Sequence, residues 1–427
     1  MAGVGSSQTS LDAWLLAQQS LHGAPIDMGL DRVRAVAQAL GLLPVPFRTI
    51  TVAGTNGKGS TCACLTGLLQ AAGRTVGTFT SPHLLQYNER IRVDGRMATD
   101  AELIAAFQAI DAARGSTTLT FFEYNLLAAL LVFRQRAVDW AVLEVGLGGR
   151  LDAVNIVDAD AAIVCSIGFD HRDWLGDTLE AIGREKAGVF RAGRPAILSD
   201  PGMAPVVEAE AGRIGARPWR AQRDYRFDLH ADTPGSRWRF ACGDKRFEDL
   251  PPPALPGRVQ YANAAGALAA VAVLDPSLLP PAAAVAAVLQ RLEVPGRFQV
   301  FPGPVEWILD VAHNEPAAQV LAATLQSRPV AGRTWLVAGI LGDKDIPAIA
   351  SALAPAVDQW ILCGVAEPRG LTATELAARS PVFAGARLAI DVEAGIAQAR
   401  ASASPGDRVV VCGSFLVVAP ALRLLQG

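Results

Sequence analysis

Short apolar runs alternate with helical patterns along the first half of the chain. Between about residues 47 and 200, the apolar runs are rich in β-branched and aromatic residues and are bounded by turn residues, which is typical of strands. These runs are FRTITVAG, RTVGTFTS, DWAVLEVG, DAAIVCSIG and RPAILSD. Strands that alternate with helices indicate crossover units. We therefore expect a parallel sheet with helices on both faces.

The pattern changes twice further along the chain. Residues 218–247 are polar, aromatic and irregular, and they predict β-hairpins or an appendage at a sheet edge; a helix is expected over 261–274. The segment LEVPGRFQVFPGP (292–304) contains Pro-Gly and Gly-Pro steps, which break both helix and strand. The alternation then restarts with VEWILDVA, RTWLVAGI, DQWILCG and DRVVVCGS. We place a domain boundary here, with a larger domain over 1–294 and a smaller one over 295–427.

Length and composition agree with two domains and exclude some functions. The 427 residues exceed what one hydrophobic core usually organises. Lys and Arg number 38 against 41 Asp and Glu, a net charge of −3, which provides no field for attracting nucleic acid. No apolar stretch is long enough for a membrane span, and the first residues do not resemble a signal peptide. The six cysteines show no CxxC pair and indicate buried, reduced thiols, so we expect a cytoplasmic protein, by default a monomer.

The stretch TVAGTNGKGST, residues 51–61, connects the first strand to the first helix of the alternating region. It resembles a phosphate-binding loop with its serine displaced, since Val52 and Gly59 stand where the strict pattern has glycine and Ser or Thr. Free amides at a helix N-terminus favour an anion, glycines allow close approach, and Lys58 would neutralise transferred charge. The alternative is a tight turn with a solvated lysine. We predict an α/β fold with a P-loop mononucleotide-binding domain followed by a Rossmann-like domain.

Polar residues follow other strands of the predicted sheet at their carboxyl ends, where open α/β sheets collect ligands. Ser81, Glu144 and His171 together would suit one or two Mg²⁺ ions that bridge phosphate oxygens. Each also has an ordinary interpretation. Ser81 could cap a turn, Glu144 could pair with an arginine such as Arg150, and His171 could be a half-buried histidine. Jointly, beside a phosphate loop, they favour a metal site.

Ordered motifs along the chain resemble the folylpolyglutamate synthase family of the Mur-ligase superfamily. They are PIDMGLDRV, GTNGKGS, TSPHL, TFFEYNLLAAL, LEVGLGGRLDAVN, GFDH, REKAGVF, PGRFQ, DVAHN, LGDKD and CGSF, and they span about residues 10–420. PIDMGLDRV is similar to the bacterial bifunctional type, which also acts as dihydrofolate synthase. The resemblance implies ATP-dependent ligation of L-glutamate to dihydropteroate and to reduced folates through an acyl phosphate.

The resemblance also implies roles for individual residues. It assigns ATP to Thr55, Asn56, Gly57, Lys58, Gly59, Ser60, Asn263, Arg297 and Asp310, with His313 nearby. It assigns Mg²⁺, as two ions, to Ser81, Glu144, His171 and Lys186, the last as a carbamate, and counts Lys58, His171 and Lys186 as catalytic. It assigns the dihydropteroate portion to Asp27, Met28, Gly29, Thr120, Phe121, Phe122, Glu123, Leu151, Asp152 and Ala153. A monovalent cation stays open as a further cofactor.

Several points remain open from the residues themselves. Lys186 taken alone is a helical lysine, which is usually a solvated surface group. Phe121 and Phe122 could pack on the pterin while Asp152 accepts its N–H groups, or both rings could belong to the core. A base must deprotonate the attacking amine, and the candidates by residue type are His83, His171 and His313.

Two other functions compete with this assignment. Another amide ligase of the same superfamily would usually carry an additional N-terminal domain, for which the residues before the first predicted strand are too few. A small-molecule kinase would explain the loop but not the second α/β domain.

Overall fold

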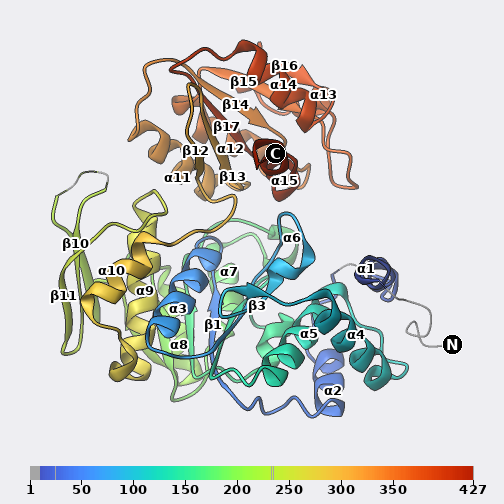
Figure 1. Cartoon of the computed structure of the whole chain (residues 1–427), viewed down its shortest axis with the longest axis vertical. Coiled ribbons are helices and arrows are strands. Elements are labelled where there is room, and N and C mark those ends of the chain that lie inside the picture. The colour runs from blue at the N-terminus through green and yellow to red at the C-terminus, as the bar shows by residue number, and fades with distance from the viewer. Residues whose placement is uncertain (1–9, 25, 232, 234, 427) are drawn as a thin grey trace. The chain divides into compact units, whose positions relative to one another are not determined.

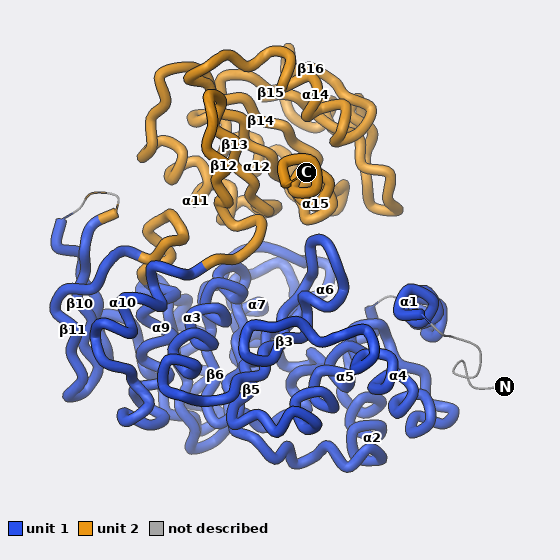
Figure 2. Tube along the Cα trace, in the orientation of Figure 1, with its two compact units in different colours: residues 1–231, 236–252, 262–292 blue, residues 232–235, 253–261, 293–427 orange. Residues whose placement is uncertain are grey.

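The computed structural model describes residues 10–24, 26–231, 233 and 235–426, which divide into two compact units (Figures 1 and 2). Unit 1 comprises Met1–Ala231, Ser236–Pro252 and Ala262–Leu292, and unit 2 comprises Asp232–Gly235, Pro253–Tyr261 and Glu293–Gly427. None of the helices within the described ranges is long and apolar enough to cross a membrane.

Unit 1 is built on a large sheet with the strand order β4-β3-β2-β5-β1-β6-β7-β8. The strands from β2 to β8 in this order are parallel, while β3 and β4 form an antiparallel edge. The strands are β1 (Arg48–Ala53), β2 (Val76–Phe79), β3 (Ile91–Val93), β4 (Arg96–Met97), β5 (Trp140–Glu144), β6 (Ala161–Val164), β7 (Pro195–Leu198) and β8 (Arg217–Arg220). The strands predicted around residues 48, 76, 140, 161 and 195 are confirmed.

Helices cover this sheet because its central strands are buried along their length, so both faces need an apolar cover. The helices of unit 1 are α1 (Leu11–Ser20), α2 (Asp31–Ala39), α3 (Lys58–Ala71), α4 (Asp100–Arg114), α5 (Phe121–Gln135), α6 (Arg172–Leu175), α7 (Leu179–Ala187), α8 (Pro205–Ile214), α9 (Val259–Leu274) and α10 (Ala282–Gln290). Short 3₁₀ turns add η2 (Tyr87–Arg90), η3 (Ala153–Ile156) and η4 (Pro276–Leu278).

The irregular segment 218–247 contains the predicted hairpins. Strands β9 (Tyr225–Leu229), β10 (Trp238–Cys242) and β11 (Lys245–Leu250) form a separate antiparallel sheet. The beginning of the segment differs from the prediction, since β8 pairs in parallel with β7 as the last strand of the large sheet. An edge strand is half exposed and tolerates polar residues, which explains why RPWR did not stand out as a strand.

Unit 2 is a second α/β unit, and its sheet has the strand order β12-β13-β17-β14-β15-β16. Its strands are β12 (Gln299–Phe301), β13 (Glu306–Asp310), β14 (Thr334–Ala338), β15 (Gln359–Cys363), β16 (Arg387–Ala389) and β17 (Arg408–Cys412), all parallel except β12. Its helices are α11 (Glu315–Gln326), α12 (Ile346–Leu353), α13 (Ala373–Ala377), α14 (Val392–Ser402) and α15 (Phe415–Gln426), with turns η5 (Ala354–Ala356) and η6 (Pro381–Phe383).

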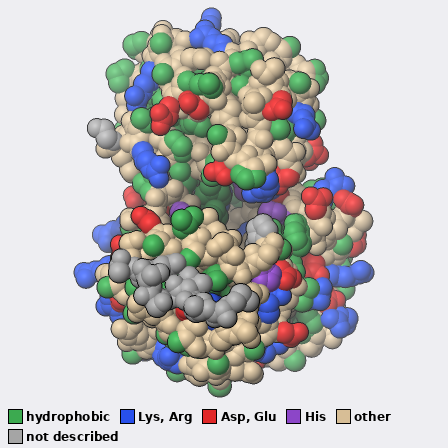
Figure 3. Space-filling model, turned by 90° about the vertical axis from the view of Figure 1, so that its right-hand side faces the viewer, with side chains coloured by type: hydrophobic (Ala, Val, Ile, Leu, Met, Phe, Trp, Pro, Cys, Tyr) green, Lys and Arg blue, Asp and Glu red, His purple; other side chains and the backbone are tan. Residues whose placement is uncertain are grey.

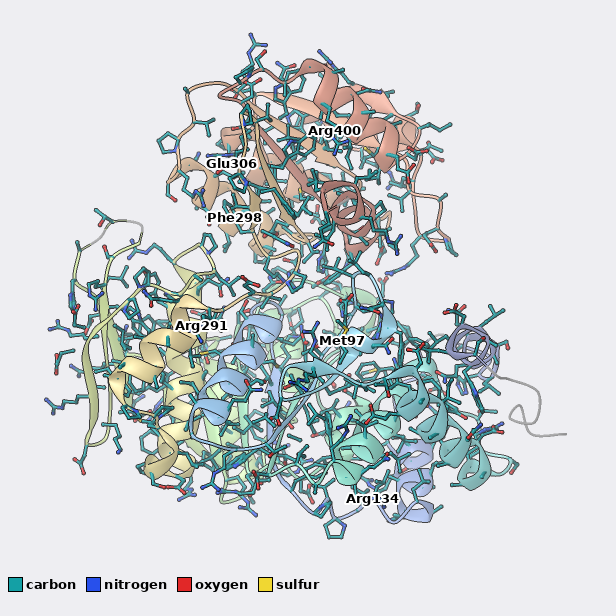
Figure 4. All side chains as sticks on the ribbon, in the orientation of Figure 1. Met97, Arg134, Arg291, Phe298, Glu306 and Arg400 are labelled. Atoms are coloured by element: carbon teal, nitrogen blue, oxygen red, sulfur yellow. The ribbon has the colours of Figure 1, made fainter. Side chains whose placement is uncertain are left out.

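An ion pair joins the starts of two neighbouring strands of unit 2. Glu306, labelled in Figure 4, begins β13 and pairs at 3.0 Å with Arg408, which begins the neighbouring β17. On the face drawn in Figure 3, basic and acidic side chains are interspersed. The six cysteines are free and buried, as predicted.

Candidate active site

The loop after β1 has the geometry of an anion-binding turn. Helix α3 begins at Lys58, and its N-cap residue Gly57 has φ 90°, a left-handed conformation that favours glycine. No side chain caps the helix, so its first amides keep their capacity to bind an anion. A Cβ atom on Gly54 would lie 3.0 Å from Cβ of Cys165, which follows β6. The glycines therefore let the loop approach the sheet closely.

Hydrogen bonds hold this loop against the segment that follows β6. The amide of Thr55 donates to the carbonyl of Ser166 at 2.9 Å, and its hydroxyl exchanges hydrogen bonds of 3.0 Å with the backbone of Gly168. Asn56 donates its amide to the Ser166 hydroxyl at 3.1 Å. Lys58 is not a fully solvated group, because Nζ donates to the carbonyl of Gly54 at 3.0 Å and to that of Thr55 at 3.2 Å.

Helix α9 brings Asn263 to the same loop. A Cβ atom built on Gly57 would lie only 2.5 Å from Oδ1 of Asn263, and Asn263 is buried. Two residues of the predicted nucleotide set, far apart in the sequence, thus lie in contact within unit 1. Ser60 in the first turn of α3 is also buried.

The structure joins Ser81 to Glu144 at the carboxyl ends of β2 and β5. Glu144 is buried, and its Oε2 accepts a 3.1 Å hydrogen bond from the amide of Ser81. The alternative ion pair with Arg150 is not formed, since Arg150 pairs with Glu185 at 2.8 Å. A buried carboxylate at the end of a parallel strand suits a hard cation such as Mg²⁺, because hard cations prefer oxygen ligands.

His171 lies after β6 with a left-handed backbone, φ 50°, and caps the short helix α6. Its amide donates to Asp170 Oδ1 at 2.9 Å, and its Nε2 lies 3.9 Å from Asp170 Oδ2. Within the described ranges, no three His, Cys, Asp or Glu side chains gather as a metal cluster. The predicted ligand set does not need one, because it includes a serine and a modified lysine.

Lys186 is not the solvated surface group that a helical lysine usually is. The residue is 4% exposed and lies on the buried face of α7 with Ile182, one turn earlier. Burial, followed by the positive charge of Lys58, lowers its pKa to about 7, against the opposing effect of Asp170. An amine of this kind is partly neutral near pH 7 and therefore nucleophilic.

The segment around Asp152 is held by its own backbone. Asp152 Oδ2 accepts from the amides of Gly146 and Leu147 at 3.0 and 2.8 Å, and Oδ1 accepts from Val154 at 3.0 Å. Burial raises the pKa of Asp152 to about 6, although these hydrogen bonds oppose the shift. The carboxylate thus orders the loop that carries Leu151 and the turn η3 that contains Ala153.

The other segments assigned to the acceptor are linked to each other by charge. Thr120 caps α5 in a capping box with Glu123, whose Oε1 lies 3.3 Å from Arg32. Arg32 also pairs with Asp27 at 2.7 Å. Segment 27–29 is therefore linked to the N-terminus of α5. It also lies close to the loop after β5, since a Cβ atom built on Gly148 would lie 3.7 Å from the methyl group of Met28.

Phe121 and Phe122 are both partly buried and both pack on other rings. Phe121 lies edge-on to Tyr87 with ring centroids 6.0 Å apart, and Phe122 lies 5.6 Å from Phe79. Each ring thus has core contacts, and neither is wholly enclosed.

Sequence reasoning missed Arg90. This residue is buried, and its Nε donates to Nδ1 of His83 at 2.7 Å. Burial lowers the pKa of His83 to about 4, and the charge of Arg90 acts in the same direction. The motif NERI gave no signal for this pair, because the contact depends on how η2 folds back on the loop after β2.

Unit 2 contains its own group of predicted nucleotide contacts. Asp310 ends β13 and accepts from the amides of Phe298 and Ala312, each at 2.8 Å. Burial raises its pKa, and the charge of Arg297 opposes this rise. Arg297 lies over the ring of Phe415 at 5.5 Å. Nδ1 of His313 lies at hydrogen-bond distance, 2.7 Å, from the carbonyl oxygen of Val311.

Known families and proteins match this chain along nearly its whole length. The model of the Mur ligase middle domain matches residues 52–271, and that of the Mur ligase glutamate ligase domain matches residues 296–415. The dihydrofolate synthase/folylpolyglutamate synthase of Escherichia coli K12 is 42% identical over 420 residues, which cover 97% of this chain and 96% of that protein. The protein of the same name from Haemophilus influenzae is 38% identical over 431 residues, covering 96% of each.

Solved structures agree with these sequence matches. Escherichia coli FolC in complex with DHPP and ADP superposes with a TM-score of 0.92 at 41% identity, covering 100% of this chain and 99% of that one. A bifunctional folylpolyglutamate synthase/dihydrofolate synthase with Mn, AMPPNP and L-glutamate bound gives 0.90 at 42% identity, covering 98% and 99%. The chain therefore belongs to the dihydrofolate synthase/folylpolyglutamate synthase family of Mur-type, ATP-dependent ligases.

Proposed function

We propose that this protein uses ATP to join L-glutamate to dihydropteroate, giving dihydrofolate, and to reduced folates, giving folylpolyglutamates. The observation that carries this proposal is the uncapped N-terminus of α3, with its left-handed Gly57, beside the Ser81–Glu144 pair. The solved relatives that contain DHPP with ADP, and Mn with AMPPNP and L-glutamate, support the same classes of ligand.

We assign the triphosphate to the loop residues 55–60, with Asn263 from α9 as a further contact. Lys58 Nζ, which donates to loop carbonyls, would turn to the transferred phosphoryl group and neutralise its charge. Arg297, Asp310 and His313 are assigned to the nucleotide from unit 2.

Ser81, Glu144, His171 and Lys186 are assigned to two Mg²⁺ ions, which would supply charge neutralisation on the phosphate oxygens. Lys186 suits a carbamate because a buried amine with a lowered pKa can attack CO₂ as its neutral form. The new bond joins Nζ to the CO₂ carbon, one proton leaves to solvent, and the side chain becomes an anion. The carbamate of Lys186 would then be a negative ligand, whereas the unmodified ammonium group would repel the metal.

The proposed reaction has two steps. An oxygen of the acceptor carboxylate attacks the γ-phosphorus of ATP, the bond to the bridging oxygen breaks, and ADP leaves with that electron pair. The amine of glutamate then attacks the carbonyl carbon of the acyl phosphate, and inorganic phosphate leaves as the amide forms. The amine loses its proton to a base, for which His83, His171 and His313 are candidates by type.

The acceptor would lie on segments 27–29, 120–123 and 151–153. Arg32 pairs with Asp27 and with Glu123, and Asp152 accepts from the amide of Gly146, where a Cβ atom would lie 2.7 Å from the ring of Phe122. We place the functional domain boundary between residues 294 and 295. We also propose a cytoplasmic monomer, a location supported by six free, buried cysteines.

The test is an assay of purified protein with ATP, Mg²⁺, glutamate and either dihydropteroate or a reduced folate, scored by the mass of the amide product. Phosphate should appear only when glutamate is present. A small-molecule kinase would instead accumulate a stable phosphorylated acceptor without glutamate, and a related amide ligase would leave both acceptors unchanged.

Lys58→Ala should reduce turnover by at least about 100-fold, since it removes the charge beside the transferred group. Product formation is measured at saturating ATP, with thermal unfolding as the check on folding. Near-normal turnover would refute the assignment of the loop to ATP.

A further inference from the structure

A buried cation lies close to both halves of the candidate site in unit 1. Arg90 is 8% exposed, and its guanidinium carbon lies 5.5 Å from the ring centre of Phe121, which belongs to an acceptor segment. Its charge also interacts with Glu144, the predicted metal ligand. Arg90 is therefore within reach of the place where the acceptor carboxylate would meet the metal and the phosphate.

The carboxylates near Arg90 are engaged with backbone amides. Glu89 accepts from the amides of residues 84–86 at 2.7–2.9 Å, and Glu144 accepts from the amide of Ser81. Among the described residues, no carboxylate forms an ion pair with Arg90 within 4.0 Å. A buried guanidinium without such a partner is costly, and an anionic ligand would compensate it.

The bond between Arg90 and His83 fixes what the imidazole can do. A guanidinium has donors and no acceptor, so Nδ1 of His83 must accept the 2.7 Å hydrogen bond from Nε of Arg90. The proton of the neutral ring then lies on Nε2. His83 is thereby set as a hydrogen-bond donor on the loop that also carries Ser81.

We propose that Arg90 and His83 form a donor pair that binds the acceptor carboxylate and then the acyl phosphate made from it. Arg90 supplies positive charge and His83 supplies its Nε2–H, so both stabilise negative oxygens. This inference rests on the proposed ligase function. It also removes His83 from the candidate bases for the glutamate amine and leaves His171 and His313.

Three substitutions of His83 separate a donor from a base. His83→Gln keeps an N–H near the position of Nε2 but cannot act as a base, His83→Asn reaches only the position of Nδ1, and His83→Ala removes both. We expect His83→Gln to keep kcat within about 10-fold of the wild type, whereas the Asn and Ala variants lose about 100-fold or more. ADP affinity should be unchanged in all three.

Arg90→Gln should raise KM for dihydropteroate by about 10- to 100-fold and lower kcat, with KM for ATP unchanged. Arg92→Gln is the matched control, since Arg92 lies two residues along in β3 and its Nε donates to the carbonyl of Glu89 at 3.3 Å. If Arg90→Gln loses ADP binding, Arg90→Lys keeps the charge without the Nε–H and should retain the KM for dihydropteroate better than kcat.

A partial reaction isolates the step. The assay uses ATP with a labelled oxygen between the β- and γ-phosphates, with acceptor present and glutamate absent. Movement of the label to a non-bridging position of the β-phosphate reports reversible acyl phosphate formation. Arg90→Gln and His83→Ala should slow this exchange by at least about 10-fold, while His83→Gln and Arg92→Gln keep it. A His83→Gln variant as inactive as His83→Ala, with ADP binding intact, would overturn the proposal. Absence of product and exchange in the wild type would instead refute the ligase function itself.

Discussion

Lys186 shows how burial changes the chemistry of a single residue. A surface lysine is protonated at neutral pH, but burial and the nearby Lys58 lower the pKa of Lys186 to about 7. The neutral amine is the form that reacts with CO₂. The amine is mostly neutral at pH 8 and mostly protonated at pH 6, so carbamate formation should increase as pH rises through 7.

We predict that protein incubated with ¹³C-bicarbonate at pH 8 shows a carbamate resonance that is weaker after incubation at pH 6. Lys186→Ala should lack this signal and lose activity by at least about 100-fold, because the metal would lose its proposed ligand. Acetate or propionate in solution should restore part of the activity. Full activity of the variant without any added carboxylate would make Lys186 a structural residue only.

The burial of Lys186 was predictable from the sequence only in part. Ile182 and Lys186 are four residues apart, which places them on the same face of a helix. The spacing therefore indicated that Lys186 shares the face of the apolar residue Ile182. The depth of burial was not predictable. It depends on Gly149, where a Cβ atom would lie 2.7 Å from the carbonyl of Glu185, and this packing joins distant segments.

At the level of elements, the link from β1 to α3 depends on Gly57 for two separate reasons. Its φ of 90° disfavours any side chain, and an added Cβ atom would lie 2.5 Å from Oδ1 of Asn263. Gly57→Ala should therefore displace Asn263 or the loop and raise the Kd for ATP by at least about 10-fold, in addition to a backbone strain of about 1–2 kcal/mol.

Gly73→Ala provides the matched control for this prediction at the other end of α3. Gly73 has φ 74°, and a Cβ atom there would have nothing within 4 Å. The strain should be similar, so both variants should lose thermal stability, but Gly73→Ala should keep the wild-type Kd, measured by calorimetry. Equal affinity in both variants would mean that the contact with Asn263 does not position the loop.

The central strands and the P-loop were predictable because burial on both faces leaves continuous apolar runs between glycines. Short edge strands were not. Strands β3 and β4 are brief and carry exposed polar residues such as Arg96, so they lack a readable period. The pair of Arg90 and His83 was missed for a related reason, since it arises from tertiary folding of a 3₁₀ turn and no motif marks it.

At the scale of the whole molecule, the residues assigned to the nucleotide are divided between the two compact units. The loop after β1 and Asn263 belong to unit 1, whereas Arg297, Asp310 and His313 belong to unit 2. One ligand that both groups bind would favour conformations in which the units approach each other. Exclusion of water from an acyl phosphate gives such closure a chemical purpose.

We predict that a non-hydrolysable ATP analogue with Mg²⁺ decreases the radius of gyration of the protein, measured by solution scattering. Lys58→Ala serves as the control, because weakened binding at the loop should remove the change at the same analogue concentration. Identical dimensions of the wild type with and without the analogue, under conditions where calorimetry shows saturation, would contradict closure.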